Sequence, residues 1–174
     1  KSDLLIFKTL EGLKKIKNIL ILDNSNNDQL GRKIKKKYKN IKFFSSKCNM
    51  GYGAGNNFLI NKINTKYALI LNPDCFVHSN EIEKILNFIK NINENFSIIG
   101  VKDQAKIINK KKILNKNYFI AEYVKGFFML LNLKKLKNVG LFDENFFLYL
   151  EEIDLCKRAR LLNERIIALS GIKL

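Results

Sequence analysis

Short apolar runs alternate with helix-like segments along this chain, and that alternation restricts the fold more than any other feature. The runs have the length of strands buried on both faces of a sheet, and most end in polar turn residues. Between them, apolar residues recur at helical spacing. Strands that alternate with helices imply right-handed crossovers and a mostly parallel sheet. We therefore predict one three-layer α/β domain with a mostly parallel central sheet over residues 1–174.

The same pattern assigns a range to each element. Strands are expected at Asn18–Asp23, Ile41–Ser45, Tyr67–Leu71, Ser97–Val101, Val124–Asn132 and Arg165–Leu169. Helices are expected at Asp3–Ile16, at Gln29–Tyr38, from about Ala54, from Ser79 or Asn80 to about Ile92, at Leu133–Val139 and at Glu151–Leu162. The lysine-rich stretch Gln104–Asn117 favours a loop or a hairpin.

The composition is that of a chain that buries its own core. Hydrophobic residues make up 47% of the 174 residues, which suffices without disulfides or a structural metal. The richest apolar run, Gly126–Leu133, is far shorter than the ~18 to 20 residues of a membrane span. Lys1-Ser2-Asp3 has none of the ordered regions of a signal peptide. We therefore expect a cytoplasmic protein.

Three cysteines, Cys48, Cys75 and Cys156, are widely spaced and include no CxxC pair. Their odd number argues against a disulfide framework, and His78 is the only imidazole that could join them in a zinc site. We expect reduced and mostly structural thiols.

The net charge of +16 raises a second hypothesis, because lysine-rich surfaces attract phosphates and anionic lipids. A non-catalytic module that binds nucleic acid or a membrane would gather its lysines on one face. Lys, Asn and Ile are abundant throughout the chain, which favours a compositional origin of the charge. We expect no nucleic-acid partner, and peripheral membrane contact stays open.

Polar turn residues follow three of the predicted strands, at Asp23, at Cys48–Asn57 and at Asn72–Asp74. Ligands bind in the crevice outside the carboxyl ends of the strands in such sheets. Three glycines in Cys48–Asn57 precede a helix and would let backbone N–H groups approach a phosphate, although a simple turn also explains them. An NAD-binding fingerprint is the alternative, but it needs glycine at position 56, which is asparagine.

Asn72 and Asp74 flank Pro73, which stops the strand ladder and fixes the turn. One carboxylate there, with diphosphate oxygens and water, can hold Mg²⁺ or Mn²⁺. The three residues also fit a plain turn into the next helix. The neighbouring motifs favour the metal.

An acidic cluster lies in the aromatic segment Gly140–Arg158 of this otherwise basic chain. Glu151, Glu152 and Asp154 crowd together there, and carboxylates beside apolar groups gain proton affinity, which suits a general base. The alternative is an acidic helix N-terminus, where carboxylates oppose the helix dipole and Arg158 pairs with Asp154 one turn away.

Five motifs follow one another along nearly the whole chain. They are Asp23-Asn-Ser-Asn-Asn-Asp28, Asn49-x-Gly51-Tyr52-x-x-Gly55-x-Asn57, Leu71-Asn-Pro-Asp74, Gly126-Phe-Phe-Met-Leu-Leu131 and Phe142-Asp-Glu…Glu151-Glu-Ile-Asp-Leu-Cys-Lys-Arg158. As an ordered set they are specific, and they resemble family 2 glycosyltransferases, especially the rhamnosyltransferase-like branch.

The resemblance implies a GT-A fold and an inverting transfer of a sugar, from dTDP-rhamnose or a UDP-sugar, to a saccharide or lipid-linked saccharide during surface polysaccharide synthesis. A bound Mg²⁺ or Mn²⁺ would steady the departing diphosphate. Asp74 is the implied metal ligand, Glu152 the implied base and Glu151 its rival. Asp154 and Arg158 would orient the helix. The implied donor-binding residues are Asp23, Asn24, Asn49, Gly51, Gly55, Asn57, Asn72 and Gly126.

Two departures from the family pattern concern the ends of the sequence. The family's first strand would precede Lys1, so we expect a partial catalytic domain that lacks one strand. The family also continues past Arg165–Leu169 to a metal-binding histidine and a C-terminal extension, and His78 is on the wrong element to replace that histidine. Residues 1–174 alone are then expected to bind donor poorly. The parent enzyme is expected at the inner face of the cell membrane.

Overall fold

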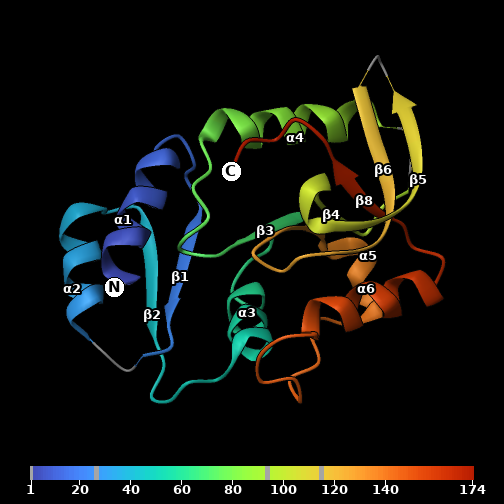
Figure 1. Cartoon of the computed structure of the whole chain (residues 1–174). Coiled ribbons are helices and arrows are strands. Elements are labelled where there is room, and N and C mark those ends of the chain that lie inside the picture. The colour runs from blue at the N-terminus through green and yellow to red at the C-terminus, as the bar shows by residue number, and fades with distance from the viewer. Residues whose placement is uncertain (1, 26–27, 93–94, 114–115) are drawn as a thin grey trace.

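The computed structural model describes residues 2–25, 28–92, 95–113 and 116–174, which form three layers with sheet between two groups of helices (Figure 1). The helices are α1 (Ser2–Gly12), α2 (Asp28–Lys37), α3 (Tyr52–Ile60), α4 (Ser79–Asn91), α5 (Leu133–Val139) and α6 (Glu151–Leu161), with a 3-10 turn at Lys102–Gln104. The strands are β1 (Ile19–Asp23), β2 (Ile41–Ser45), β3 (Tyr67–Leu71), β4 (Ile98–Val101), β5 (Ala105–Ile113), β6 (Lys116–Val124), β7 (Phe128–Asn132) and β8 (Ile166–Leu169).

Six strands form the larger sheet, in the order β3-β7-β4-β8-β6-β5. β3, β4, β8 and β5 point in one direction, and β7 and β6 run against them. Most strands thus share a direction, as predicted, but within the described part of this sheet only β4 and β8 pair in parallel. The reason is that β7 enters between β3 and β4 as an antiparallel partner of both.

The two faces of the six-stranded sheet carry separate cores. On one face, Ile98 and Ile166 pack with side chains of α5 and α6. On the other face, Ile99 and Ile167 pack with side chains of α4 and with Leu13, just beyond α1. Successive side chains of a strand point to opposite faces, and these four isoleucines are all fully buried. Burial on both faces explains the uninterrupted apolar sequences of β4 and β8.

β1 and β2 form a second, parallel sheet of two strands. β1 pairs with β2 along one edge, and β3 pairs with β7 along one edge. The other edges of β1 and β3 border a shared, largely apolar cavity of about 510 Å³, which Ile19–Ile21 and Tyr67–Leu71 line together with side chains of α1 and α3. No strand of the described residues pairs with either edge, so both are open towards the same space.

The hairpin of β5 and β6 tests two of the sequence predictions. The lysine-rich stretch forms that hairpin, with residues 114 and 115 outside the described ranges. The single strand predicted at Val124–Asn132 is wrong, because Lys125–Phe127 turn the chain and separate β6 from β7. None of the helices in the described ranges is long and apolar enough to cross a bilayer.

Candidate active site

Asp23 ends β1 with a carboxylate that is only half satisfied. The residue is 7% exposed, and its Oδ1 accepts hydrogen bonds from the backbone N–H and the hydroxyl of Ser25, at 2.8 and 2.6 Å. Its Oδ2 is buried without a hydrogen-bond partner among the described residues. A buried oxygen in this state gains from a ligand that donates to it, so Asp23 suits the predicted contact with the donor. Residues 26 and 27 of the same motif lie outside the described ranges.

The glycine turn before α3 is held by two asparagines. Asn24 Nδ2 donates to the Gly51 carbonyl oxygen at 3.1 Å, and Asn49 Oδ1 accepts from the Gly51 N–H at 3.0 Å. Gly51 has a φ of 84°, and a Cβ there would lie 2.5 Å from the Phe147 carbonyl oxygen. A Cβ at Gly55 would lie 3.1 Å from Asn24 Nδ2. These four predicted residues thus form one packed turn, and their contact with a donor stays a prediction.

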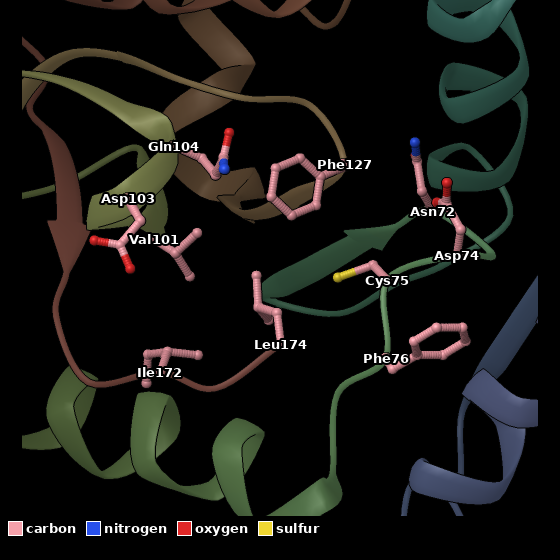
Figure 2. Close-up of a pocket in the computed structure, with 10 residues that line it drawn as sticks. All are labelled: Asn72, Asp74, Cys75, Phe76, Val101, Asp103, Gln104, Phe127, Ile172 and Leu174. Atoms are coloured by element: carbon pink, nitrogen blue, oxygen red, sulfur yellow. The ribbon is translucent and has the colours of Figure 1, made fainter.

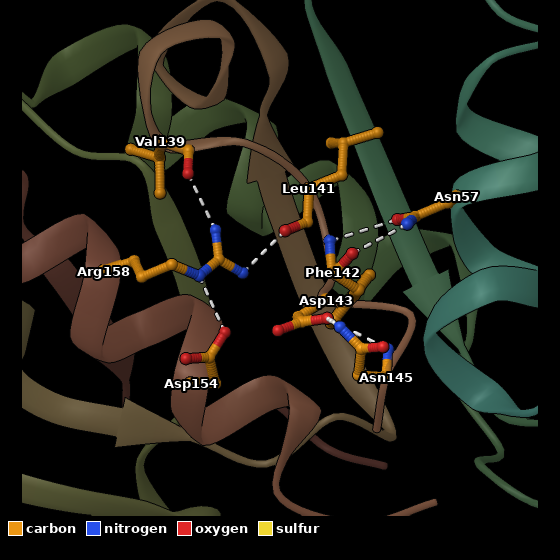
Figure 3. Close-up of polar contacts among 8 residues, drawn as sticks. All are labelled: Asn57, Val139, Leu141, Phe142, Asp143, Asn145, Asp154 and Arg158. Atoms are coloured by element: carbon orange, nitrogen blue, oxygen red, sulfur yellow. Dashed lines mark hydrogen bonds and ion pairs between the residues drawn. The ribbon is translucent and has the colours of Figure 1, made fainter. Parts of the chain in front are cut away.

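Asn57, also predicted to shape the donor pocket, is buried in α3 with both ends of its amide engaged. Its Nδ2 donates to the Phe142 carbonyl oxygen and to Glu144 Oε1, both at 2.9 Å, and its Oδ1 accepts from the Phe142 N–H at 3.1 Å. Figure 3 shows the pair of contacts with Phe142. Asn57 therefore positions the chain that leads into α6.

Arg158 anchors the same stretch from α6. Its Nε donates to Asp154 Oδ2 at 2.7 Å, which confirms the predicted pairing one turn apart. Its Nη1 and Nη2 donate to the carbonyl oxygens of Val139 and Leu141, both at 2.7 Å (Figure 3). Three charge-assisted bonds from one planar group fix the chain ahead of the acidic pair.

That acidic pair opens α6. Glu151 is 4% exposed and Glu152 is 8% exposed, and the Oε2 of each has no hydrogen-bond partner among the described residues. Burial raises the pKa of the Glu151 carboxyl above its ordinary value, and the charge of Glu152 adds to the rise. A buried carboxylate with an unused oxygen and raised proton affinity has the properties of a general base.

Tyr52 joins this pair to the turn at Gly126. Its hydroxyl donates to the Gly126 carbonyl oxygen at 2.6 Å, and a Cβ at Gly126 would meet its ring carbons at 3.4 Å. Burial, followed by the charges of Glu151 and Glu152, raises the Tyr52 pKa, so the phenol stays protonated. The sequence had shown Tyr52 only as part of a motif. Its position between Gly51 and Gly53, in the glycine-rich turn, was the available signal in the sequence.

A cavity of about 580 Å³ lies where β3 and β4 end. Asn72 and Asp74 line one side and Asp103 and Gln104 another, with Phe127 also on the wall (Figure 2). The Asn72 N–H donates to the Phe127 carbonyl oxygen at 3.0 Å. Because Phe127 follows Gly126, the cavity adjoins the turn that Tyr52 contacts. The structure thus brings the predicted residues into two adjoining groups, one around the acidic pair and one around Asp74.

The oxygen ligands of this cavity suit a cation that shares its coordination with a substrate. Asp74 is exposed, and the described residues contain no group of three or more His, Cys, Asp or Glu that could hold a metal ion. Carboxylate and amide oxygens from Asp74 and Asn72 are the hard ligands that Mg²⁺ and Mn²⁺ prefer, with phosphate oxygens supplying the rest. The residues therefore fit the implied metal, provided that phosphate oxygens of a substrate supply the remaining ligands.

Asp103 and Gln104 were missed by sequence reasoning. They follow β4 as polar residues, in the way that Asn72 and Asp74 follow β3, and that parallel was the usable signal. Cys75 lines the same cavity, but burial raises its thiol pKa to about 11, so it is no nucleophile near neutral pH. Cys75 and Cys156 are buried free thiols, as expected of structural cysteines, whereas Cys48 is exposed.

Two curated relatives align with most of this chain. The low-salt glycan biosynthesis hexosyltransferase Agl10 of Haloferax volcanii is 24% identical over 173 residues, which cover 83% of this chain and 54% of the relative. The rhamnosyltransferase WbbL of Escherichia coli K12 is 25% identical over 189 residues, which cover 90% of this chain and 68% of the relative. This chain therefore spans about half the length of the first relative and two thirds of the second.

A solved structure shares the fold at low sequence identity. GalNAc-T7, solved with UDP, GalNAc and Mn²⁺, superposes with a TM-score of 0.76 at 12% identity, over 95% of this chain and 39% of GalNAc-T7. This likeness confirms the predicted GT-A fold. The sequence profile of glycosyl transferase family 2 matches residues 5–156, well over half of the chain. The chain belongs to glycosyl transferase family 2.

Proposed function

We propose that this domain transfers a sugar from a nucleotide-sugar donor to a hydroxyl of a saccharide or lipid-linked saccharide, with inversion at the anomeric carbon. Membership of the family supports the reaction class, and the names of the two relatives, a hexosyltransferase and a rhamnosyltransferase, support a hexose or deoxyhexose donor. dTDP-rhamnose and UDP-sugars are the first donors to test. The pathway we propose is surface polysaccharide synthesis at the inner face of the cell membrane.

The observation that carries this proposal is the buried carboxylate pair beside the Gly126 turn. Glu151 and Glu152 each keep one carboxylate oxygen without a partner among the described residues. Tyr52 fixes Gly126 next to them, and Phe127 continues from there to the wall of the cavity that contains Asp74. This arrangement supports a base on one side of the turn and an oxygen ligand for a diphosphate-bound cation on the other.

The chemical step needs one proton acceptor, and Glu152 is our choice, with Glu151 as the rival. The carboxylate takes the proton of the acceptor hydroxyl while that oxygen attacks the anomeric carbon. A new carbon–oxygen bond forms as the bond to the diphosphate breaks, and the nucleoside diphosphate leaves with the electron pair. Attack opposite the leaving group inverts the anomeric centre.

Asp74, supported by Asn72, would hold Mg²⁺ or Mn²⁺ against the diphosphate. When bound, the cation neutralises negative charge on the departing group. Asp23 would accept a hydrogen bond from the nucleoside through its unused Oδ2. The Gly51 turn would face the diphosphate, and Gly126 would leave room for the sugar.

We also propose that the domain is completed by one more strand between β1 and β3. The open edges of β1 and β3 border the same cavity, and each edge offers backbone hydrogen bonds to an inserted strand. A chain extended by such a strand should show slower amide exchange in both β1 and β3. Unchanged exchange in both strands would contradict this proposal without touching the reaction.

Thermal unfolding with UDP-, dTDP- and GDP-sugars, with and without Mn²⁺, tests the donor site. A donor at 100 times its Kd should add about 2.7 kcal/mol to the free energy of unfolding. Asp74→Ala should abolish the part of the shift that depends on Mn²⁺, and Glu83→Ala, which removes an exposed carboxylate on α4, should leave it intact. Stabilisation by DNA and by no donor would refute the transferase proposal and favour the basic-module alternative.

The identity of the base is tested by two matched variants. Glu152→Gln should lower the rate of transfer about 10² to 10⁴-fold while the donor-induced thermal shift persists, because the amide keeps the shape but cannot take a proton. Glu151→Gln should cost less. The opposite ranking would make Glu151 the base, and two fully active variants would remove the pair from the mechanism.

A further inference from the structure

The most exposed apolar segment of the described chain lies directly before the acidic pair. Phe147, Leu148, Tyr149 and Leu150 are 56%, 52%, 74% and 57% exposed. Exposed hydrophobic residues elsewhere in the described chain occur singly or in pairs, which is normal for a soluble surface. Four large apolar side chains in succession form a contiguous patch, and such patches mark contacts with membranes or other molecules.

The chain holds this segment rigidly at both ends. The Tyr52 N–H donates to the Phe147 carbonyl oxygen at 2.9 Å, and the missing side chain at Gly51 allows that close approach. The Asp154 N–H donates to the Leu150 carbonyl oxygen at 2.9 Å. The apolar side chains therefore project from a fixed backbone.

The backbone between those anchors is also strained. Tyr149 has a φ of 69° and Leu150 a φ of 74°, a left-handed conformation that large side chains rarely adopt. Glycine would relieve the strain at either position, yet both carry large apolar groups. Strain kept at a solvent-facing site next to functional residues indicates that the side chains themselves have a use.

We propose that Phe147–Leu150 is the segment by which this domain docks on an anionic lipid surface. Aromatic and leucine side chains are those that enter the interfacial zone of a bilayer. The net charge of +16 supplies long-range attraction to anionic lipid, and exposed Lys47 lies on the loop that reaches Gly51 beside the segment. Figure 1 shows the chain before α3 and the chain before α6 side by side.

Two acidic side chains lie just before the segment, and both accept hydrogen bonds from other residues of the protein. Asp143 Oδ1 accepts from the backbone and the side chain of Asn145, each at 2.9 Å, and Glu144 Oε1 accepts from Asn57 at 2.9 Å. Together with the buried carboxylates of Glu151 and Glu152 they make the immediate neighbourhood acidic, so attraction to anionic lipid comes from the net charge of the whole chain. Apolar insertion therefore supplies the docking energy, and net charge supplies the preference for anionic lipid.

Docking has one consequence that rests on the proposed function. Glu151 follows Leu150 directly, so a bilayer that receives Phe147–Leu150 lies next to the acidic pair. A hydroxyl of a lipid-linked acceptor at that surface would arrive beside the proposed base.

Sedimentation with vesicles tests the docking segment. Vesicles of phosphatidylcholine with 30% phosphatidylglycerol should bind the protein more tightly than pure phosphatidylcholine, and added salt should reduce the difference. Leu148→Asp should weaken binding at least about tenfold, because a buried leucine contributes that much. Leu161→Asp is the matched control, since Leu161 is 72% exposed at the other end of α6 and should leave binding unchanged.

Equal binding by Leu148→Asp and Leu161→Asp would overturn the proposal, as would equal binding to neutral and anionic vesicles. Concentration-dependent self-association that disappears only in Leu148→Asp would also overturn it, by assigning the patch to a second copy of the chain. The donor-induced thermal shift should persist in Leu148→Asp. Docking can therefore fail while donor binding survives, and donor binding can fail while docking survives.

Discussion

Strand β1 of the two-stranded sheet is as apolar as β4 and β8 of the six-stranded sheet, yet it is buried to a different extent. Ile98, Ile99, Ile166 and Ile167 in the six-stranded sheet are fully buried, whereas residues Ile19–Leu22 of β1 are only half-buried. β4 and β8 have strand neighbours on both sides and helices on both faces. β1 has β2 on one side and a cavity of about 510 Å³ on the other.

The difference shows that an uninterrupted apolar sequence indicates the burial that a strand is suited to, which can exceed the burial that it has. A run such as that of β1 suits a strand with neighbours on both sides, so its partial burial supports the additional strand proposed above between β1 and β3. The six-stranded sheet should consequently carry most of the stability of these residues, and the two-stranded sheet should open first.

A leucine pair offers the strongest test of that contrast. Leu131→Ala in β7 removes a fully buried side chain and should lower the free energy of unfolding by about 3 kcal/mol. Leu20→Ala in β1 removes a half-buried one and should cost about 1 kcal/mol. Denaturant unfolding measures both, and similar losses would break the comparison.

A glycine pair should give the next largest difference. A Cβ at Gly100 would lie 2.5 Å from the Cβ of buried Val124, so Gly100→Ala should cost about 1 to 3 kcal/mol. A Cβ at Gly31 in α2 would meet the ring of half-buried Phe43 at 2.6 Å, but that ring can turn, and alanine favours a helix by up to about 1 kcal/mol. Gly31→Ala should therefore be nearly neutral by the same measurement. A large loss at Gly31 would show that the two-stranded sheet is packed as tightly as the other.

Amide exchange should separate the two sheets without mutation. Amides of β4 and β8 should exchange only through global unfolding, and amides of β1 should exchange through local opening, because one edge of β1 is open. Mass spectrometry of native-state exchange measures both sets. Protection of β1 equal to that of β4 would contradict the open edge.

Titration should give the smallest effects, with opposite signs in the two regions. Lys14, Lys37 and Tyr38 lower the pKa of Glu11, on the two-stranded side, to about 2, so its contribution is present above pH 4.5 and is lost as the pH falls towards 2. Glu151 has a raised pKa, so its contribution is present below pH 4.5 and is lost as the pH rises through the raised value.

Glutamine variants of Glu11 and Glu151 test these two opposite pH dependences of stability. Glu11→Gln should flatten the fall in Tm on acidification, and Glu151→Gln should remove a loss of Tm on the way to neutral pH. Thermal unfolding between pH 2 and 7 follows both variants against the unchanged chain. If both variants changed the pH dependence of Tm in the same direction, one of the two pKa shifts would be assigned to the wrong cause.

The sequence predicted the order of elements and the site's acidic pair because both depend on local pattern. Apolar runs located β3, β4 and β8, and the acids at the start of α6 were visible as a cluster. The antiparallel entry of β7 between β3 and β4 joins residues far apart along the chain, and no local pattern reports it. The boundary between β6 and β7 was missed because Phe127 continues the apolar run through the turn.

Within the site, residue types were easier to predict than partners. Asp23 keeps an unused oxygen, as a ligand contact requires, but the amides of Asn24 and Asn57 are taken up by the protein itself. Asparagine can serve a ligand or a backbone equally well, so only the three-dimensional arrangement distinguishes the two uses. Asp103 reaches the cavity through the placement of β4, which depends on the whole sheet.

The hydrogen bonds that hold the chain ahead of α6 in place have a consequence for protein engineering. Asn57 and Arg158 fasten the stretch from Val139 to Phe142, and Tyr52 and Asp154 fasten Phe147 and Leu150. The side chains of Phe147–Leu150 are exposed, so they can be exchanged while the backbone that carries them stays in place. Substituting them can retarget the domain to a different surface while the carboxylates of α6 keep their places.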